Sequence, residues 1–218
     1  PIPGPLLHMA RQRGLPVFTT YGLTEMASQV TTTRRDDSPG EITTAGRLLP
    51  YREVSTALDG EILVKGATLF RGYVEGDRVA LPLDNDGWFH TGDVGRIDAD
   101  GCLTVLGRKD NMFISGGENI FPEEIESALL GFTEIVEAVI VPLDDAEFGR
   151  RPVAFVRFGE GKRLSKSELL LEMQTKLPRF KLPVYFYEWP EDMYDEGAKP
   201  ARTAFRQLIT DGKAKPIT

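Results

Sequence analysis

The stretch GRKDNMFISGGENIFPEEIE, Gly107 to Glu126, marks the place where the pattern of the chain changes. Within it, Pro122 and the two glutamates that follow predict the start of a helix, because proline tolerates the first turn and carboxylates stabilise its positive end. The adjacent Gly116 and Gly117 stand just before this helix. A β-bulge or turn would explain them without a ligand, and the alternative is a ligand that passes close to bare backbone.

Upstream of this stretch, from Tyr51 to Arg108, the chain predicts β-structure. The segments VSTALDGEILVKG and VGRIDADGCLTVLG each carry an Asp-Gly pair between two short apolar runs. An Asp-Gly pair in this context is a strong local signal for a β-hairpin. We therefore expect a β-rich subdomain over about residues 40–108.

Downstream, residues 109–218 predict a small α+β unit. EAVIVPL, RPVAFVRF and PVYFYEW are typical of strands, and ARTAFRQLI is typical of a terminal helix. The run from Ser165 to Glu168 is a capping box that begins another helix, which Pro178 ends. The fold class expected for the whole chain is α+β, with more than one domain.

The N-terminal region predicts a short helix over residues 5–13 and a buried strand from Leu15 to Thr20, which ends in the turn Tyr21-Gly22. The first residue is proline, and the predicted strand has no earlier strand to pair with. We expect the chain to be the downstream part of a longer protein.

Charge and composition exclude several classes of function. The chain has 33 acidic and 26 basic side chains and a net charge of -7, which opposes binding to nucleic acid or to an anionic membrane surface. The single cysteine, Cys102, cannot form an intrachain disulfide, and neither it nor His8 and His90 show a metal-ligand spacing. No apolar run approaches the roughly 20 residues that span a bilayer, and no signal peptide is evident. We expect a globular, cytoplasmic protein.

A series of motifs carries the chemistry. YGLTE, from Tyr21 to Glu25, combines an aromatic ring, a hydroxyl and a carboxylate on one loop, although by itself it could be a turn with a solvated glutamate. It is followed in order by GEILVKGATLFRGY, GWFHTGDVGRI, the stretch quoted first, and EGAKPARTAF.

This ordered series resembles the adenylate-forming superfamily of acyl-CoA synthetases, peptide-synthetase adenylation domains and luciferases. The resemblance spans nearly the whole chain but covers only the downstream half of the family pattern. The phosphate loop and part of the acyl pocket of that family would lie before Pro1, so we do not expect a chain without them to be a competent enzyme. The resemblance implies the end of a large AMP-binding domain over residues 1–108 and a mobile C-terminal lid domain over 109–218.

The resemblance also implies a nucleotide site. Tyr21 would stack on adenine, Thr24 would contact the α-phosphate, and Glu25 would hold Mg²⁺, a hard cation that prefers oxygen ligands and bridges phosphates. Asp93 would bind the ribose hydroxyls, and Arg108 would make a second ribose contact. For Asp93, a turn-capping role is the alternative.

Three further roles follow from the resemblance. Asp110 would be the hinge of the lid domain, although an aspartate in an ordinary interdomain loop would look the same. Gly116 and Gly117 would clear a passage for the pantetheine arm of CoA. Lys199 would bridge the carboxylate and the α-phosphate during adenylation, where a positive charge stabilises the transition state. Pro200 after it departs from the family pattern, and a solvated loop lysine is the alternative.

Three residues of chemical interest receive other expectations. His8 is expected on a helix surface, His90 at a turn near the nucleotide, and Cys102 in the core. Neither histidine is expected to act as a general base, because adenylation uses a carboxylate that is already ionised.

The segments YGLTEMASQVTTT, NMFISGGENIFPEEIE and VPLDDAEFGRRPVAF look most like the o-succinylbenzoate-CoA ligases of menaquinone biosynthesis. The implied reaction is the activation of 2-succinylbenzoate with Mg-ATP, followed by transfer to CoA. Ser28 and the run Thr31 to Thr33 could donate to the acid, or they could belong to an ordinary polar strand. The expected partners are a small carboxylic acid, ATP and CoA, without nucleic acid or membrane insertion, and a homodimer is the oligomer considered.

Other functions stay open. Within the class, the alternative is another aryl- or fatty-acyl-CoA ligase. A peptide-synthetase adenylation domain is a second alternative, against which stands the lack of a carrier-domain Gly-Gly-x-Ser tether after the terminal helix. A third is a non-catalytic nucleotide-binding or interaction module.

Overall fold

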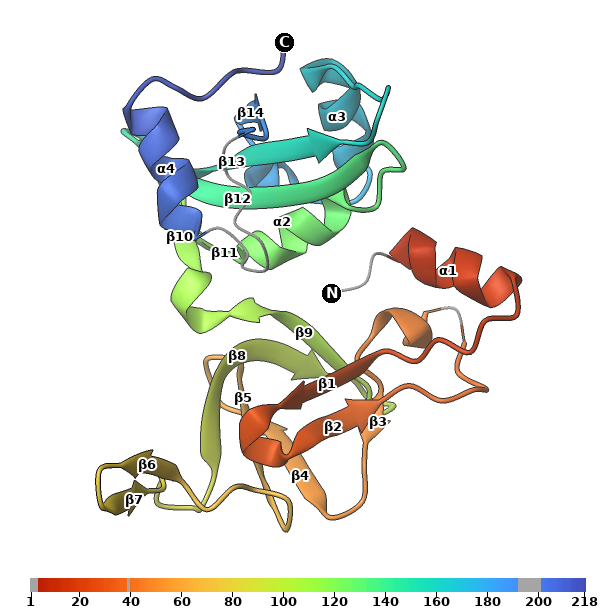
Figure 1. The fold of residues 1–218 in the computed structure, drawn as a ribbon, viewed down its shortest axis with the longest axis vertical. Helices are drawn as coiled ribbons and strands as arrows, with labels where there is room; N and C mark the ends of the chain where they lie inside the picture. The colour runs from red at the N-terminus through yellow and green to blue at the C-terminus, as the bar shows by residue number, and fades with distance from the viewer. Residues whose placement is uncertain (1–3, 39, 192–200) are drawn as a thin grey trace. The chain divides into compact units, whose positions relative to one another are not determined.

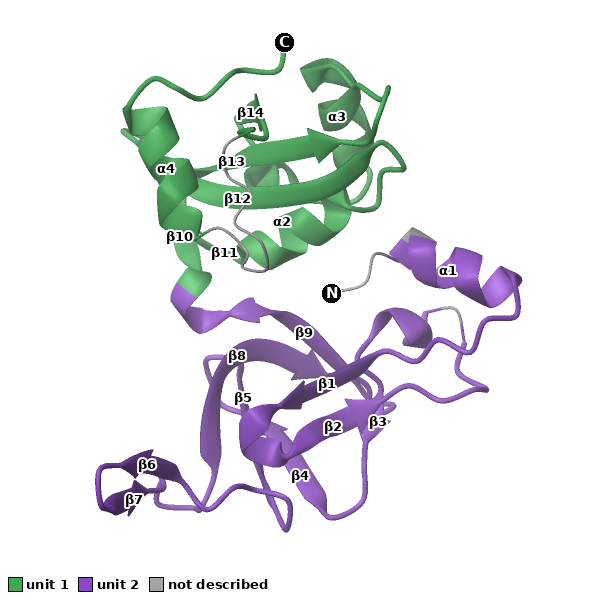
Figure 2. Cartoon of the chain, in the orientation of Figure 1, with its two compact units in different colours: residues 1, 111–218 green, residues 2–110 purple. Residues whose placement is uncertain are grey.

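A computed structural model of the chain describes residues 4–38, 40–191 and 201–218. It divides into two compact units, unit 2 from Ile2 to Asp110 and unit 1 from Asn111 to Thr218 (Figure 2). The fold class is α+β, as the sequence predicts.

Unit 2 is built mainly of antiparallel strands (Figure 1). Its helices and strands are α1 (Gly4–Gln12), β1 (Thr20–Leu23), η1 (Thr24–Met26), β2 (Ser28–Thr32), η2 (Glu41–Thr43), β3 (Arg47–Leu48), β4 (Arg52–Thr56), β5 (Glu61–Gly66), β6 (Tyr73–Glu75), β7 (Arg78–Ala80), β8 (Phe89–Ile97) and β9 (Leu103–Arg108). The 3-10 turn η3 (Lys109–Asn111) follows β9.

The largest sheet of unit 2 has the order β4-β5-β8-β9. Both hairpins that the Asp-Gly pairs predict are confirmed: β4 pairs with β5, and β8 pairs with β9. The turn residues Gly60 and Gly101 have positive φ angles of 83° and 76°, which L-residues with a side chain rarely adopt. The Asp-Gly residues of the two turns are therefore sufficient to explain these two hairpin connections.

The predicted buried strand from Leu15 to Thr20 is wrong. Leu15 and Phe18 are 54% and 44% exposed, and β1 begins only at Thr20, which pairs with Thr32 of β2. Pro16 has no N–H to donate to a ladder, and an apolar run does not by itself specify the strand beside it. The predicted helix before it is confirmed as α1.

One core cluster connects the two larger sheets of unit 2. The β1-β2-β3 sheet contributes Tyr21 and Val30, and the four-stranded sheet contributes Ile62, Val64 and Phe89. All five are less than 10% exposed. Burial of this apolar surface holds the loop that begins at Tyr21 against the strand that carries the TGD motif.

Among its described residues, unit 1 combines a three-stranded sheet and a two-stranded sheet with three α-helices. Its elements are β10 (Phe113–Ser115), β11 (Glu118–Ile120), α2 (Pro122–Leu129), β12 (Ile135–Asp145), β13 (Gly149–Phe158), α3 (Lys166–Met173), η4 (Arg179–Lys181), β14 (Tyr185–Glu188) and α4 (Arg202–Thr210). The predicted strands and helices of this region are confirmed, and so is the capping box between Ser165 and Glu168.

The β12-β13-β14 sheet is buried on both faces (Figure 1). Ala154 and Val156 of β13 pack on one side with residues of α2 and α3, whereas Val153 and Phe155 pack on the other side with Phe205 of α4. This alternation is the period of a strand that faces two apolar layers. Charged contacts lie outside these apolar layers, as between Arg202 of α4 and Glu123 of α2 and between Arg157 of β13 and Glu137 of β12.

Candidate functional site

The TGD motif forms a bulge in β8. Glu61 of β5 pairs with Val94, but Leu63, two residues on, pairs with His90, so β8 runs through extra residues between these two pairs. The hydroxyl of Thr91 closes the bulge, because it donates to the carbonyl of Ile62 at 2.8 Å and accepts from the backbone N–H of Asp93 at 3.1 Å. A bulge of this kind re-aims the side chain that follows it.

Asp93 is the centre of the candidate site in unit 2. Its Oδ2 accepts a 2.7 Å hydrogen bond from the hydroxyl of Tyr21, and its Oδ1 accepts a 3.1 Å hydrogen bond from the guanidinium of Arg108. Asp93 and Arg108 are direct cross-strand partners on β8 and β9. The structure thus brings together three residues that the sequence assigned to one nucleotide site. An ionised carboxylate can accept further hydrogen bonds beside these two.

Tyr21 is almost entirely covered, with 8% of its surface exposed. Burial raises the pKa of Tyr21 above its ordinary range, and the Asp93 carboxylate adds to the increase. The phenol therefore stays a hydrogen-bond donor to Asp93. Its stacking on adenine stays a prediction.

Arg108 lies close to the backbone of the bulge. It donates to the carbonyl of Thr91 at 3.0 Å as well as to Asp93. Gly92, with φ +71°, leaves room for it: a Cβ there would lie 3.0 Å from a guanidinium nitrogen. The glycine of TGD is thus explained by both its backbone conformation and the approach of Arg108.

Glu25 is held from two sides by the segment around β6. The hydroxyl of Tyr73 donates to Glu25 Oε1 at 2.7 Å, and the backbone N–H of Phe70 donates to the Glu25 carbonyl at 2.7 Å. The hydrogen bond to Glu25 raises the pKa of Tyr73. Thr24, the preceding residue, is exposed on η1.

The surroundings of Glu25 fit Mg²⁺ only together with a phosphate ligand. Among the described residues, no group of three or more His, Cys, Asp or Glu side chains could hold a metal ion by itself. Mg²⁺ is commonly bound by one or two carboxylates plus substrate phosphates, so a single half-buried glutamate is a suitable protein contribution.

Asp110, the expected hinge residue, is the last residue of unit 2. Its side chain is 86% exposed and lies 3.8 Å from Arg108. The hinge role stays a prediction.

Gly116 and Gly117 form the turn of the β10–β11 hairpin, in which Ser115 pairs with Glu118. Both have positive φ, 57° and 88°, as a two-residue type I′ turn requires. A Cβ at Gly116 would lie 2.8 Å from the ring of Phe148, whereas a Cβ at Gly117 would meet nothing within 4 Å. The turn therefore accounts for both glycines, and the passage of CoA beside Gly117 stays a prediction.

Lys199, the predicted adenylation lysine, lies outside the described residues.

Several other residues take structural places. Thr31 and Thr33 are buried, and their hydroxyls bond to the Ala45 carbonyl and to Thr19, which favours the polar-strand alternative for these two. His8 is exposed on α1, and Cys102 is fully buried.

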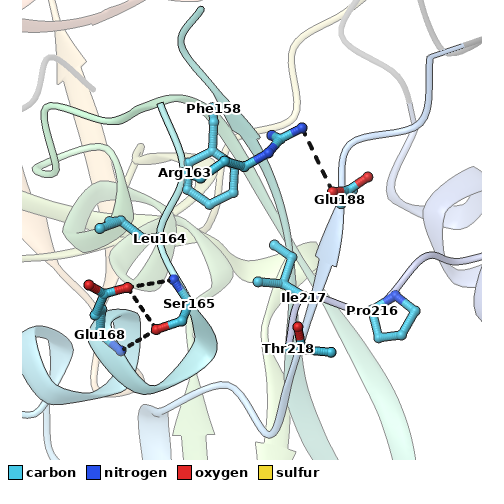
Figure 3. Close-up of a pocket in the computed structure, with 9 residues that line it drawn as sticks. All are labelled: Phe158, Arg163, Leu164, Ser165, Glu168, Glu188, Pro216, Ile217 and Thr218. Atoms are coloured by element: carbon cyan, nitrogen blue, oxygen red, sulfur yellow. Dashed lines mark hydrogen bonds and ion pairs between the residues drawn. The ribbon is translucent and has the colours of Figure 1, made fainter. Parts of the chain in front are cut away.

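A surface pocket of unit 1 does not belong to the candidate site (Figure 3). It lies between the end of β13, the start of α3 and the C-terminal residues. Its polar groups already bind one another: Ser165 bonds to Glu168, and Arg163 lies 3.8 Å from Glu188. None of the residues that the sequence assigned to a site lines it.

Sequence reasoning missed Tyr73 and Thr91. Tyr73 reaches Glu25 across 48 positions of the chain, and Thr91 reaches Ile62 across 29. Their only sequence signal is membership of the GEILVKGATLFRGY and GWFHTGDVGRI motifs, which does not reveal the partner.

Residues 124–193 match the family of the AMP-binding enzyme C-terminal domain. The chain is also 36% identical to the 2-succinylbenzoate–CoA ligase of Geobacillus sp. (strain WCH70) over 222 residues, which are 98% of this chain and 45% of that protein. It thus spans less than half the length of this relative. No described helix is long and apolar enough to cross a membrane.

Two solved structures of o-succinylbenzoate coenzyme A synthetase from Bacillus subtilis are similar to this chain. The complex with the acyl-adenylate intermediate OSB-AMP has a TM-score of 0.83 and 33% identity, and the match covers 94% of this chain and 44% of that one. The complex with ATP and magnesium ion has a TM-score of 0.76 and 35% identity, with 87% and 41% covered. With this similarity along nearly its whole length and an AMP-binding C-terminal domain in unit 1, the chain belongs to the adenylate-forming superfamily.

Proposed function

We propose that the chain acts as part of an AMP-forming acid–thiol ligase, which adenylates a carboxylate with ATP and then transfers the acyl group to CoA. The proposed acid is 2-succinylbenzoate, as in menaquinone biosynthesis. The observation that carries the proposal is the meeting of Tyr21 and Arg108 on the Asp93 carboxylate, in a chain whose relatives carry this ligase name.

The first half-reaction would use the residues of unit 2. Asp93 would accept hydrogen bonds from the ribose hydroxyls, with Arg108 as a second ribose contact and Tyr21 stacked on adenine. The existing bonds to Asp93 support this role, because they fix the orientation of its carboxylate before the nucleotide arrives.

The phosphates would be held by the loop after Tyr21. Thr24 would donate its hydroxyl to the α-phosphate, and Glu25 would hold Mg²⁺ together with phosphate oxygens. Bound there, the ion would neutralise charge on the phosphates. Tyr73 supports this role of Glu25, since it orients one carboxylate oxygen and leaves the other to the cation.

The bond changes of adenylation need no general base. An ionised carboxylate oxygen attacks the α-phosphorus, and the bond from that phosphorus to pyrophosphate breaks. Lys199 would bridge the carboxylate and the α-phosphate and so stabilise the charge that develops between them.

The second half-reaction would use unit 1. The thiol of CoA attacks the acyl carbon and expels AMP, and the pantetheine arm would pass beside Gly116 and Gly117. The open space around a Cβ position at Gly117 supports this assignment. Asp110 would be the hinge about which the C-terminal lid domain, residues 109–218, changes its orientation between the two half-reactions.

The test uses the complete product of the reading frame that contains this chain. It is incubated with Mg-ATP, CoA and a panel of acids that includes 2-succinylbenzoate, and the acyl-CoA products are identified by mass spectrometry. Asp93→Ala is measured in parallel, and Asp98→Ala, in an exposed hairpin turn, is the matched control.

Each outcome has a defined meaning. A dominant succinylbenzoyl-CoA product that depends on Asp93 and not on Asp98 supports the whole proposal. A different thioester keeps the reaction and replaces the acid, and an acyl-adenylate without thioester indicates a carrier-protein acceptor. No pyrophosphate release with any acid refutes the proposal. Sedimentation of the same protein tests the proposed homodimer, and cell fractionation tests the proposed cytoplasmic location.

A further inference from the structure

Glu61 is a buried carboxylate that the proposed reaction does not use. It is the first residue of β5 and is 6% exposed. Its Oε1 accepts a 3.0 Å hydrogen bond from the backbone N–H of Gly92, and its Oε2 accepts a 2.9 Å hydrogen bond from Lys109. His90 lies on the same oxygen, with Nδ1 at 3.1 Å. A buried charge persists only when it is paired in this way.

The ionised state of Glu61 depends on these partners. Burial alone would raise the pKa of Glu61, but the hydrogen bonds from Lys109, His90 and Gly92 lower it overall. Lys109 also lies 2.7 Å from Asp59, so two carboxylates bind one ammonium group. These bonds raise the pKa of Lys109.

The hydrogen bonds of Glu61 also lie directly beside the Asp93–Arg108 pair. Gly92 precedes Asp93, and Lys109 follows Arg108, so Glu61 is bonded next to each member of the Asp93–Arg108 pair. Strands β5, β8 and β9 are neighbours in one sheet. One carboxylate therefore binds β8 at Gly92 and also Lys109, the first residue after β9, beside the candidate site.

We propose that Glu61 is a positioning residue, which fixes the backbone of the Asp93 bulge and, through Lys109, the segment that carries Arg108 and leads into Asp110. The inference rests on the proposed function for the roles of Asp93 and Asp110. It adds that the chain is anchored up to Lys109, so that any rotation at the hinge begins after that residue.

The experiment is done on the chain itself, by hydrogen exchange of the Gly92 amide. Lys109→Met removes the ammonium group from Glu61 without touching Gly92, and Lys109→Arg retains a cation at the same place. Glu53→Gln is the matched control, because Glu53 lies on the adjacent strand β4 and pairs with Lys65 at an exposed 3.6 Å contact. Far-ultraviolet circular dichroism checks that each variant is folded.

We expect Lys109→Met to raise the exchange rate of the Gly92 amide by about tenfold, because a charge-assisted contact that orients its acceptor is lost. Lys109→Arg and Glu53→Gln should exchange like the wild type. Glu61→Gln should raise exchange at both Gly92 and residues 107–111. An unchanged Gly92 amide in folded Lys109→Met would overturn the proposal, because a purely local role of Lys109 in η3 predicts that result.

Binding of AMP to the same variants separates this inference from the proposed function. We expect Lys109→Met to weaken AMP binding by about tenfold and Lys109→Arg to leave it unchanged. If hydrogen exchange of the variants follows the expected order but the wild-type chain binds no AMP, the positioning role of Glu61 is supported. The proposed role of Asp93 in nucleotide binding is then contradicted for this chain. If AMP binds and Lys109→Met neither alters exchange nor weakens binding, the positioning role fails and the proposed function stands.

Discussion

The hydroxyl of Tyr21 donates a 2.7 Å hydrogen bond to Asp93, which lies 72 positions later in the chain. Tyr21 belongs to the β1-β2-β3 sheet, and Asp93 belongs to the β4-β5-β8-β9 sheet. The bond therefore joins the two larger sheets of unit 2 at the point where the nucleotide is proposed to bind. Since the phenol is buried, water cannot easily replace it.

This relationship predicts the effect of Tyr21→Phe. The substitution keeps the ring in the core and removes only the donor to Asp93, so the free energy of unfolding should fall by about 1–2 kcal/mol. Chemical denaturation of the chain measures this. Tyr51→Phe is the control, because Tyr51 is 81% exposed, and its cost should stay within about 0.5 kcal/mol. Equal losses in the two variants would contradict a structural hydrogen bond at Tyr21.

His90 predicts a dependence of stability on pH. The hydrogen bond to Glu61 raises the pKa of His90 above its ordinary value of 6.5, and Asp84 adds to the increase. The folded state thus binds the proton more tightly than the unfolded state. The contribution of protonated His90 to the free energy of unfolding should be fully present below about pH 6.5. It should be lost as the pH rises through the higher pKa of the folded state.

The measurement compares the wild type with His90→Gln in chemical denaturation from about pH 5.5 to about pH 9. The difference in the free energy of unfolding should be largest at the acidic end and should shrink as the pH rises. His8→Gln, at an exposed position of α1, is the matched control. A difference that grows with pH would show that His90 is bound in its neutral form.

Local signals in the sequence predicted much of this fold. The Asp-Gly pairs predicted the hairpins at Gly60 and Gly101, and the capping box at Ser165 predicted the start of α3, because each signal acts within a few residues. The predicted buried strand from Leu15 to Thr20 is wrong because an apolar run is likewise only a local signal. Whether an apolar run is buried as a strand depends on a neighbour that the run does not encode.

The sequence predicted which residues meet at the candidate site but not the contacts that hold them there. The motif series placed Tyr21, Asp93 and Arg108 in one site, and the structure brings these three together. The motif series did not reveal the roles of Glu61 and Tyr73, because each contacts a partner that is distant in sequence. A single chain without related sequences carries no signal for such pairs.

Arg202 in unit 1 predicts a large effect on stability. It donates to Glu123 Oε1 at 3.1 Å, to Glu126 Oε2 at 3.1 Å and to the Ile140 carbonyl at 2.8 Å, and its side chain is 26% exposed. Arg202→Met would leave two largely buried carboxylates without their cation, with only the Asn111 side chain and the Ile140 N–H still donating to them. The free energy of unfolding should therefore fall by about 2–3 kcal/mol. Thermal or chemical denaturation measures this.

The same helix supplies the control for this prediction. Arg206 pairs with Asp144, whose side chain is 71% exposed, and an exposed ion pair contributes at most about 1 kcal/mol. Arg206→Met should therefore be nearly neutral. A loss in Arg202→Met no greater than that in Arg206→Met would mean that the carboxylates of α2 are solvated without their partner.

Lys199→Ala should separate the two half-reactions of the proposed enzyme. Adenylation should fall by about a hundredfold or more, because a positive charge aimed at the transition state is lost. Thioester formation from a supplied acyl-adenylate should change little. Both rates are measured on the complete protein, with Lys213→Ala as a control near the C-terminus. An equal loss in both half-reactions would contradict the role given to Lys199.

Gly117→Leu should have the opposite effect, because its side chain would occupy the space through which the arm of CoA is proposed to pass. A side chain at φ +88° strains the turn by about 1–2 kcal/mol. Gly76→Leu controls for that strain, since Gly76 has φ +62° and likewise meets nothing within 4 Å.

The comparison distinguishes strain from obstruction. If Gly117 borders the passage of CoA, thioester formation from a supplied acyl-adenylate should fall in Gly117→Leu, adenylation should persist, and Gly76→Leu should keep both activities. Single-turnover assays with the acyl-adenylate and CoA measure the difference. Normal thioester formation in folded Gly117→Leu would mean that Gly116 and Gly117 serve only the β10–β11 turn, for which their positive φ angles are sufficient reason.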